Sequence, residues 1–283
     1  MLKDGKAREY LRPKTGSNTI RPTNFLSTMD SQSMPEQAAT PAPVLTNPGK
    51  PGWGKAALGQ FSTPDRIAFI YKVYGWMCFG LTISALISLW VASTPSVAQA
   101  IFGNIMIFYG LLILELIAVF SLAAMVHKIS SSASAVIFVL YSALNGLTLS
   151  IIFFAYQLGS IEEIFFLAAG IFGAMSLYGF FTKRDLTTIG RLATMALLGL
   201  VIAMIINLFI MNDVYMFALA CIGIVVFVIL TAYDTQKLKW LYELGRTEGS
   251  DGEKKEAING ALILYLDFIN LFLDLLLVFG KRR

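Results

Sequence analysis

The stretch ILYLDFINLFLDLLLVFG, residues 263–280, is long and apolar enough to cross a membrane as a helix, yet it carries Asp267 and Asp274. A helix needs about 20 mostly apolar residues to cross a hydrocarbon core about 30 Å thick. A charged, unpaired carboxylate at the centre of such a helix costs roughly 2.5–3.5 kcal/mol on insertion scales. The two aspartates therefore need partners or a function, which neighbouring segments must supply.

Composition places the whole chain among membrane proteins. Of its 283 residues, 56% are hydrophobic and 14% are charged, whereas soluble domains carry about 25% charged residues. The net charge of +4 is modest, and many basic residues lie in the first 72 positions. No aromatic–basic interleaving or nucleic-acid motif accompanies these basic residues. We therefore expect membrane lipids, and not nucleic acid, as partners.

Apolar segments separated by polar ones predict an all-α membrane protein, a bundle of seven transmembrane helices. The approximate bounds of the segments are 67–92, 101–126, 134–157, 161–181, 192–211, 214–238 and 257–279. Short connections join them except at residues 240–256, WLYELGRTEGSDGEKKE, which we predict to be a charged, solvated loop.

The first part of the chain is polar and rich in Pro, Gly, Ser and Thr, and it has no apolar core typical of a signal peptide. We predict that residues 1–63 form a disordered tail before a transmembrane domain of residues 64–283. Met29 and Met34 are alternative translation starts within this tail.

Basic residues near the segment ends predict the orientation of the chain in the membrane. They cluster before the first segment and in the second, fourth and sixth loops, at Lys50, Lys55, Arg66, Lys72, His127, Lys128, Lys183, Arg184, Arg191, Lys237, Lys239, Arg246, Lys254 and Lys255. The first, third and fifth loops carry no lysine or arginine. We therefore expect the N-terminus in the cytoplasm of a cell whose inner (plasma) membrane holds the chain. Seven full spans place the basic tail, residues 281–283, outside; alternatively, the last segment does not fully cross.

Several classes of site are excluded by residue type. No lysine or arginine lies deep in an apolar segment, which argues against a retinal Schiff base. Cys78 and Cys221 lie within apolar segments and are expected to be buried thiols. A single histidine, His127, cannot form a multi-histidine metal site, and no nucleophile–base set is visible. We therefore expect neither an enzyme nor a bound cofactor.

Asp234 and Asp267 are predicted to lie at matched depth. At 1.5 Å per residue they are about 9 Å and about 12 Å from a cytoplasmic edge near residues 240 and 259, and helices that follow each other in sequence are often neighbours. Two carboxylates a few ångströms apart in low dielectric cannot both ionise cheaply, so they share a proton. When both are deprotonated they attract a hard cation such as calcium. This predicts a proton-sharing gate with calcium as its candidate metal; the alternative for Asp234 is a frayed helix end.

Three further residues are candidates for the same path. Asp274 follows Asp267 by seven residues and shares its helical face; a solvated vestibule residue is the alternative. Glu115 lies about 17 Å from the inner end of the second segment and is either structurally paired or part of the site. His127 is an interfacial residue beside Lys128, or a proton sensor.

Small and amide residues indicate where helices pack. AAGIFGAMS, residues 168–176, holds two pairs of small residues at four-residue spacing, Ala169/Gly173 and Gly170/Ala174. Such pairs allow close helix approach, although ordinary membrane-helix glycine is an equal alternative. Three amides inside the segments are expected to form interhelical hydrogen bonds: Asn145, Asn207 and Asn270.

At the motif level, the chain resembles the Bax inhibitor-1/YccA family, also called the TMBIM family. The resemblance rests on TAYDTQKLK (231–239) and LYLDFINLF (264–272), with FFTKRDLTTIGRL (180–192) and LELIAVF (114–120) as further marks. It covers about residues 66–280 and implies a seven-helix bundle with the last helix near the centre.

The resemblance also implies a function. Bacterial members are described as pH-sensitive calcium leak channels, in which a carboxylate dyad shares a proton when closed and separates on opening. The dyad positions fall on Asp234 and Asp267, and a glutamate of the second helix falls on Glu115. The family's arginine near the dyad is absent from MVHKIS (125–130), where His127 or Lys128 would take its place.

The leading prediction is therefore a calcium leak channel gated by Asp234 and Asp267, with calcium as the transported ion. One alternative is a proton-coupled ion transporter that uses Glu115 and Asp274 as relay stations. Another, suggested by family members that regulate the membrane protease FtsH, is an interaction partner of such a protease.

Overall fold

The computed structural model describes residues 64–125, 129–247 and 249–283. The predicted tail of residues 1–63 and the candidates His127 and Lys128 lie outside these described residues. Within them the secondary structure is helical: α2 (Pro64–Ser93), α3 (Pro95–Phe102), α4 (Ile105–Met125), α5 (Ser131–Leu149), α6 (Ile152–Ala155), α7 (Leu158–Phe181), α8 (Thr187–Ile210), α9 (Asp213–Thr247) and α10 (Gly249–Phe279). The all-α prediction is confirmed.

The number of membrane spans depends on one broken helix. Six helices in the described part of the chain are long and apolar enough to cross a membrane, and α3 and α4 form a pair bent by 83° that could be a seventh. Pro95 suits the first turn of α3. Beyond the end of α3, the Asn104 side chain accepts a hydrogen bond from Met106 N at 3.0 Å, where α4 begins. The predicted second segment, 101–126, therefore merged the end of one helix with the next.

The predicted solvated loop at residues 240–256 is wrong. Helix α9 continues to Thr247 and α10 begins at Gly249. Glutamate and lysine, which dominate this stretch, are good helix formers, so charge alone did not indicate a loop. The chain reverses at Gly249, whose φ of +81° lies in the left-handed region that glycine adopts at low cost.

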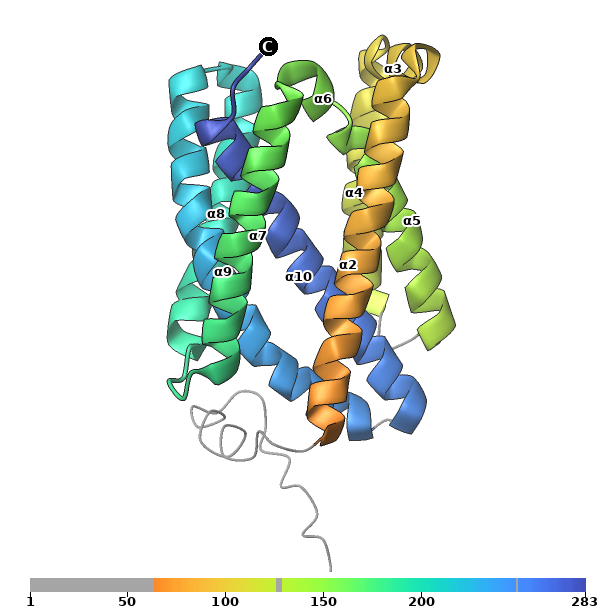
Figure 1. Cartoon of the computed structure of the whole chain (residues 1–283), viewed down its shortest axis with the longest axis vertical. Helices are drawn as coiled ribbons and strands as arrows, with labels where there is room; N and C mark the ends of the chain where they lie inside the picture. Colours follow the sequence, from red (N-terminus) through yellow and green to blue (C-terminus); the bar gives the residue numbers. More distant parts are fainter. Residues whose placement is uncertain (1–63, 126–128, 248) are drawn as a thin grey trace, which may run out of the picture. The chain divides into compact units, whose positions relative to one another are not determined.

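Helix α10 lies at the centre of the bundle, as the family resemblance implied. It packs against α9, α2, α7 and α5, and Figure 1 shows it running diagonally behind α2 and α7. In its most apolar window 61% of residues are buried, against 17–44% in the five other single-helix spans. The acidic residues of α10 are therefore surrounded by protein.

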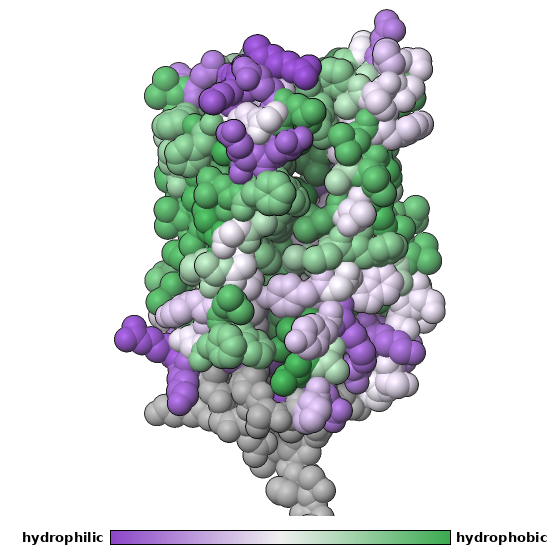
Figure 2. Space-filling model, viewed as in Figure 1, coloured by the Kyte–Doolittle hydropathy of each residue, from purple (hydrophilic) through white to green (hydrophobic). Residues whose placement is uncertain are grey.

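The outer surface of the bundle is apolar between two polar ends. Figure 2 shows hydrophobic residues across the middle of the visible face, with hydrophilic residues gathered above and below. Large exposed hydrophobic side chains are numerous on α4 and α8, including Met106, Leu198 and Phe209. Such a belt suits contact with lipid chains, because every spanning backbone group is bonded within its own helix.

Candidate functional site

The structure brings Asp234 and Asp267 together at the interface of α9 and α10. These two helices run in opposite directions and pack along each other. Asp234 is 8% exposed and Asp267 is 5% exposed. The charge of Asp234 acts on Asp267, and Asp267 Oδ2 is buried with no hydrogen-bond partner among the described residues. The pair is thus a carboxylate dyad with an unsatisfied buried oxygen.

Lys237 is a positive neighbour of this dyad that sequence reasoning missed. Its Nζ lies 3.8 Å from Asp234 Oδ1, one helical turn along α9, and its side chain is 35% exposed. The three-residue spacing was a visible signal, since charges at that spacing meet on a helix surface. A frayed helix end at Asp234 is also ruled out, because α9 continues to Thr247 and Asp234 is buried.

The α9 side of the dyad is fastened to the loop between α7 and α8. Gln236 Nε2 donates to Arg184 O at 2.8 Å, and Leu186 N donates to Gln236 Oε1 at 3.0 Å. In the same loop Asp185 Oδ1 accepts a hydrogen bond from Thr187 N at 2.9 Å. Hydrogen bonds from Thr187 hold the pKa of Asp185 below its ordinary value. The motif FFTKRDLTTIGRL therefore anchors the residues beside Asp234.

Asp274 is a second buried acid on α10. It is 6% exposed, and its Oδ2 has no hydrogen-bond partner in the described part of the chain. The carboxylate lies against Gly223 of α9, where an added methyl group would collide with it. The alternative of a solvated vestibule residue is therefore wrong, and Asp274 shares the α9–α10 interface with Asp267.

Glu115 lies in a separate polar network. Thr148 Oγ1 of α5 donates to Glu115 Oε1 at 2.6 Å, and Asn145 lies one helical turn before Thr148 on α5. Tyr265 of α10 donates to Asn145 Oδ1 at 2.8 Å, and its hydroxyl lies 2.7 Å from Ser84 Oγ of α2. The structure thus does not join Glu115 to the dyad directly. Of the three amides, Asn145 makes the expected interhelical bond, whereas Asn207 and Asn270 bond locally.

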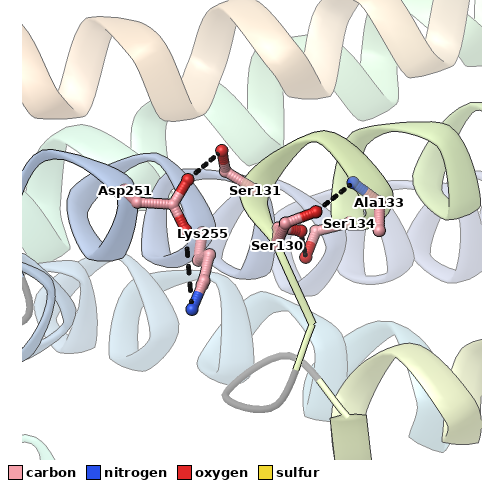
Figure 3. Close-up of polar contacts among 6 residues, drawn as sticks. All are labelled: Ser130, Ser131, Ala133, Ser134, Asp251 and Lys255. Carbon is pink, nitrogen blue, oxygen red and sulfur yellow. Dashed lines mark hydrogen bonds and ion pairs between the residues drawn. The ribbon is translucent and has the colours of Figure 1, made fainter.

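The start of α10 is fastened by charged contacts to α5 and α2. In Figure 3, Asp251 lies between Ser131 of α5, whose hydroxyl donates to it at 2.5 Å, and Lys255, whose Nζ is 3.6 Å away. Lys72 of α2 forms an ion pair with Glu253 at 2.7 Å. These contacts hold α10 to the α2–α5 side of the bundle.

The described residues contain no group of three or more His, Cys, Asp or Glu side chains that could hold a metal ion. The dyad offers two carboxylates, whereas calcium takes six to eight oxygen ligands. A cation at Asp234 and Asp267 would therefore complete its shell with water or backbone oxygens.

Comparison with known proteins identifies the family. A family model described as "Inhibitor of apoptosis-promoting Bax1" matches residues 66–283. The chain belongs to this Bax inhibitor family. Inner membrane protein YbhL of Escherichia coli (strain K12) is 47% identical over 215 residues, which are 76% of this chain and 92% of YbhL. An uncharacterized membrane protein of Streptococcus pyogenes serotype M1 is 37% identical over 216 residues, 76% of this chain and 93% of its own length.

Together, the apolar helices and the inner-membrane relative make this Bax inhibitor family member a multi-pass inner-membrane protein. The matched region contains every described helix except the first residues of α2. The dyad, Asp274 and the Glu115 network therefore all lie within the family domain.

Proposed function

We propose that this protein is a calcium leak pathway gated by the protonation of Asp234 and Asp267. The observation that carries the proposal is a buried carboxylate pair between α9 and α10 with an unsatisfied oxygen on Asp267. With one shared proton the two side chains attract each other and hold the helices together. With no proton they repel each other and attract a hard cation.

The proposed orientation puts the N-terminus in the cytoplasm, because lysine and arginine gather in the even-numbered loops. Helix α10 runs from the end of the bundle where α2 begins to the opposite end. A complete crossing by α10 favours the basic tail, residues 281–283, on the outer side. Lipids and the calcium ion are the partners that this proposal requires.

Calcium uptake into proteoliposomes, followed as a function of pH, tests the gate. Asp234→Asn and Asp267→Asn each remove one proton-sharing oxygen, so each should flatten the pH profile of uptake. Asp213→Asn is the matched control, since Asp213 is an exposed aspartate at the start of α9. Unaltered profiles in both dyad variants would overturn the proposal.

A proton-coupled transporter is the second candidate, and the buried position of Asp274 and the part-buried position of Glu115 favour it. In this case the carboxylates would load and release protons during each transport cycle. Proton counterflow in a fixed ratio to calcium identifies a transporter, whereas a leak shows calcium flux without that ratio.

An interaction with an FtsH-type membrane protease would depend on the N-terminal tail. Deleting residues 1–60 should abolish such regulation and leave ion flux intact. Loss of flux on the same deletion would instead assign the tail to the transport pathway.

A further inference from the structure

Helix α10 presents different chemistry on two opposite faces. Asp267 faces α9, whereas Tyr265, two residues earlier and about 200° around the helix, faces α2 and α5. Tyr265 is 0% exposed. Its ring packs edge-on against Phe138 and Tyr141 of α5, with centroids 5.9 Å and 5.8 Å away. Because both residues lie on α10, the hydrogen bonds of Tyr265 help to set the position of Asp267.

The Tyr265 hydroxyl has two hydrogen-bond neighbours and one proton. It donates to Asn145 Oδ1 at 2.8 Å, so Ser84 Oγ, at 2.7 Å, must be the donor in the other bond. Ser84 has two competing acceptors, because its Oγ is also 2.7 Å from Ser142 O and 3.1 Å from Gly80 O. If Ser84 turns to Ser142, Tyr265 can donate to Ser84, and Asn145 then loses its bond to α10. The network thus has two proton arrangements.

Glu115 selects between these arrangements through Asn145. A side-chain amide has a donor end and an acceptor end. Because the Asn145 oxygen accepts from Tyr265, its NH₂ group is the end left to face Glu115, whose carboxylate is bonded to Thr148 of the same helix. Thr148, which lies on α5 as Asn145 does, donates from Oγ1 to Glu115 Oε1 at 2.6 Å. Glu115 on α4 is therefore connected through α5 to α10.

We propose that Tyr265 and Asn145 are positioning residues of the gate. Their hydrogen bonds transmit the state of Glu115 to α10 and hold Asp267 against Asp234. The role of these residues in gating rests on the proposed leak function. The structural connection from Glu115 to α10 can be measured without an ion-flux assay.

The test is a double-mutant cycle between Glu115→Gln and Tyr265→Phe, read as calcium uptake at one fixed pH at which the wild-type protein is mostly closed. Glu115→Gln removes the negative charge that orients Asn145, and Tyr265→Phe removes the hydrogen bond to Asn145, so each single variant should raise uptake by about two- to tenfold. The double variant should show little more than either single one, because both break the same connection. Tyr178→Phe is the control, since Tyr178 is exposed on α7 and takes no part in these contacts, and its effect should multiply with that of Glu115→Gln.

Hydrogen–deuterium exchange of residues 258–272 in detergent provides the readout that needs no flux. Tyr265→Phe and Glu115→Gln should each speed exchange there, and Tyr178→Phe, at an exposed position of α7, should not. Ser84→Ala, which removes the other bond to Tyr265, replaces Tyr265→Phe if that variant does not fold. Unchanged exchange in α10 on Glu115→Gln, or fully multiplicative uptake in the cycle, refutes the connection. Absence of uptake in wild type and all variants, with the exchange pattern intact, refutes the leak function alone.

Discussion

At the scale of single residues, the contact between Asp274 and Gly223 directly tests how closely α9 and α10 pack. Asp274 Oδ2 is buried with no hydrogen-bond partner among the described residues, and burying such a group costs free energy. The carboxylate also needs space beside α9. Gly223 leaves that space, because any side chain there would meet the carboxylate.

Gly223→Ala should therefore destabilise the protein by about 1–3 kcal/mol, the usual cost of overpacking a filled interior. In an Asp274→Ala background the same change should cost much less, because the collision is gone. Denaturant unfolding in detergent measures both. Gly170→Ala is the control, since that glycine of α7 has open space around it. An equal cost with and without Asp274 would show that the two residues do not meet.

Asp185 should make the folding stability depend on pH independently of the dyad. Its hydrogen bonds with Thr187 hold its pKa below the ordinary value. A lowered pKa in the folded state gives stability that is fully present above the unfolded pKa, about 3.9. That stability is lost as the pH falls through the folded value.

Asp185→Ala should lower the free energy of unfolding at pH 7 by less than about 1 kcal/mol, because its hydrogen bond with Thr187 N is made by an exposed side chain one residue before the N-cap, Leu186. The difference from wild type should shrink as the pH falls below about 4. Thermal unfolding at both pH values checks this. A deficit that is the same at both values would assign the effect of Asp185 to packing and not to its charge.

At the scale of elements, both ends of α10 are fastened to other helices. Beyond its last turn, Lys281 N donates to Ser160 Oγ at 2.9 Å, Gln157 N donates to Lys281 O at 3.0 Å, and Arg283 N donates to Ala155 O at 3.0 Å. The tail thus pairs through its backbone with the connection between α6 and α7, and this pairing limits movement of α10 along its axis.

Deleting residues 281–283 should therefore speed hydrogen–deuterium exchange in residues 270–279. Replacing Lys281, Arg282 and Arg283 together by alanine keeps the backbone bonds and should leave exchange unchanged. Faster exchange in the alanine variant as well would assign the effect to side-chain charge.

The sequence predicted elements best where one apolar segment is one helix. The segments 161–181 and 192–211 match α7 and α8 to within about five residues at each end. The break between α3 and α4 was missed, because the residues on both sides of it are apolar. The stretch 240–256 was assigned to a loop on its charge, whereas it forms helix that packs against the bundle, with Leu241 and Tyr242 buried.

At the scale of the whole molecule, separation along the chain explains which contacts could be predicted. The pairing of Asp234 with Asp267 was predicted, whereas the hydrogen bonds of Tyr265 with Ser84 and Asn145 were missed. Asp234 and Asp267 lie on consecutive helices, so depth along the chain was enough to pair them. Ser84 and Tyr265 are 181 residues apart, and Asn145 and Tyr265 are 120 apart. Only the packing of three helices, α2, α5 and α10, brings them together, and serine or tyrosine in an apolar segment carries no local signal of that packing.

Polar contacts attach the two helices of the dyad mainly to different neighbours, while Tyr74 of α2 and Thr235 of α9, whose hydroxyls are 3.3 Å apart, also link α2 to α9. Helix α10 is bonded to α2 and α5 through Asp251, Glu253 and Tyr265. Helix α9 is bonded to the loop before α8 through Gln236. In the proposed gate, loss of a shared proton would act at the α9–α10 interface, where two buried carboxylates would then repel each other.

Calcium uptake into proteoliposomes by wild type and by Asp267→Asn, measured across pH in parallel, tests this account most directly. The account predicts that wild-type uptake rises with pH as the shared proton is lost, and that the asparagine variant shows a flattened response. A rise with pH in Asp267→Asn equal to that of wild type would contradict it.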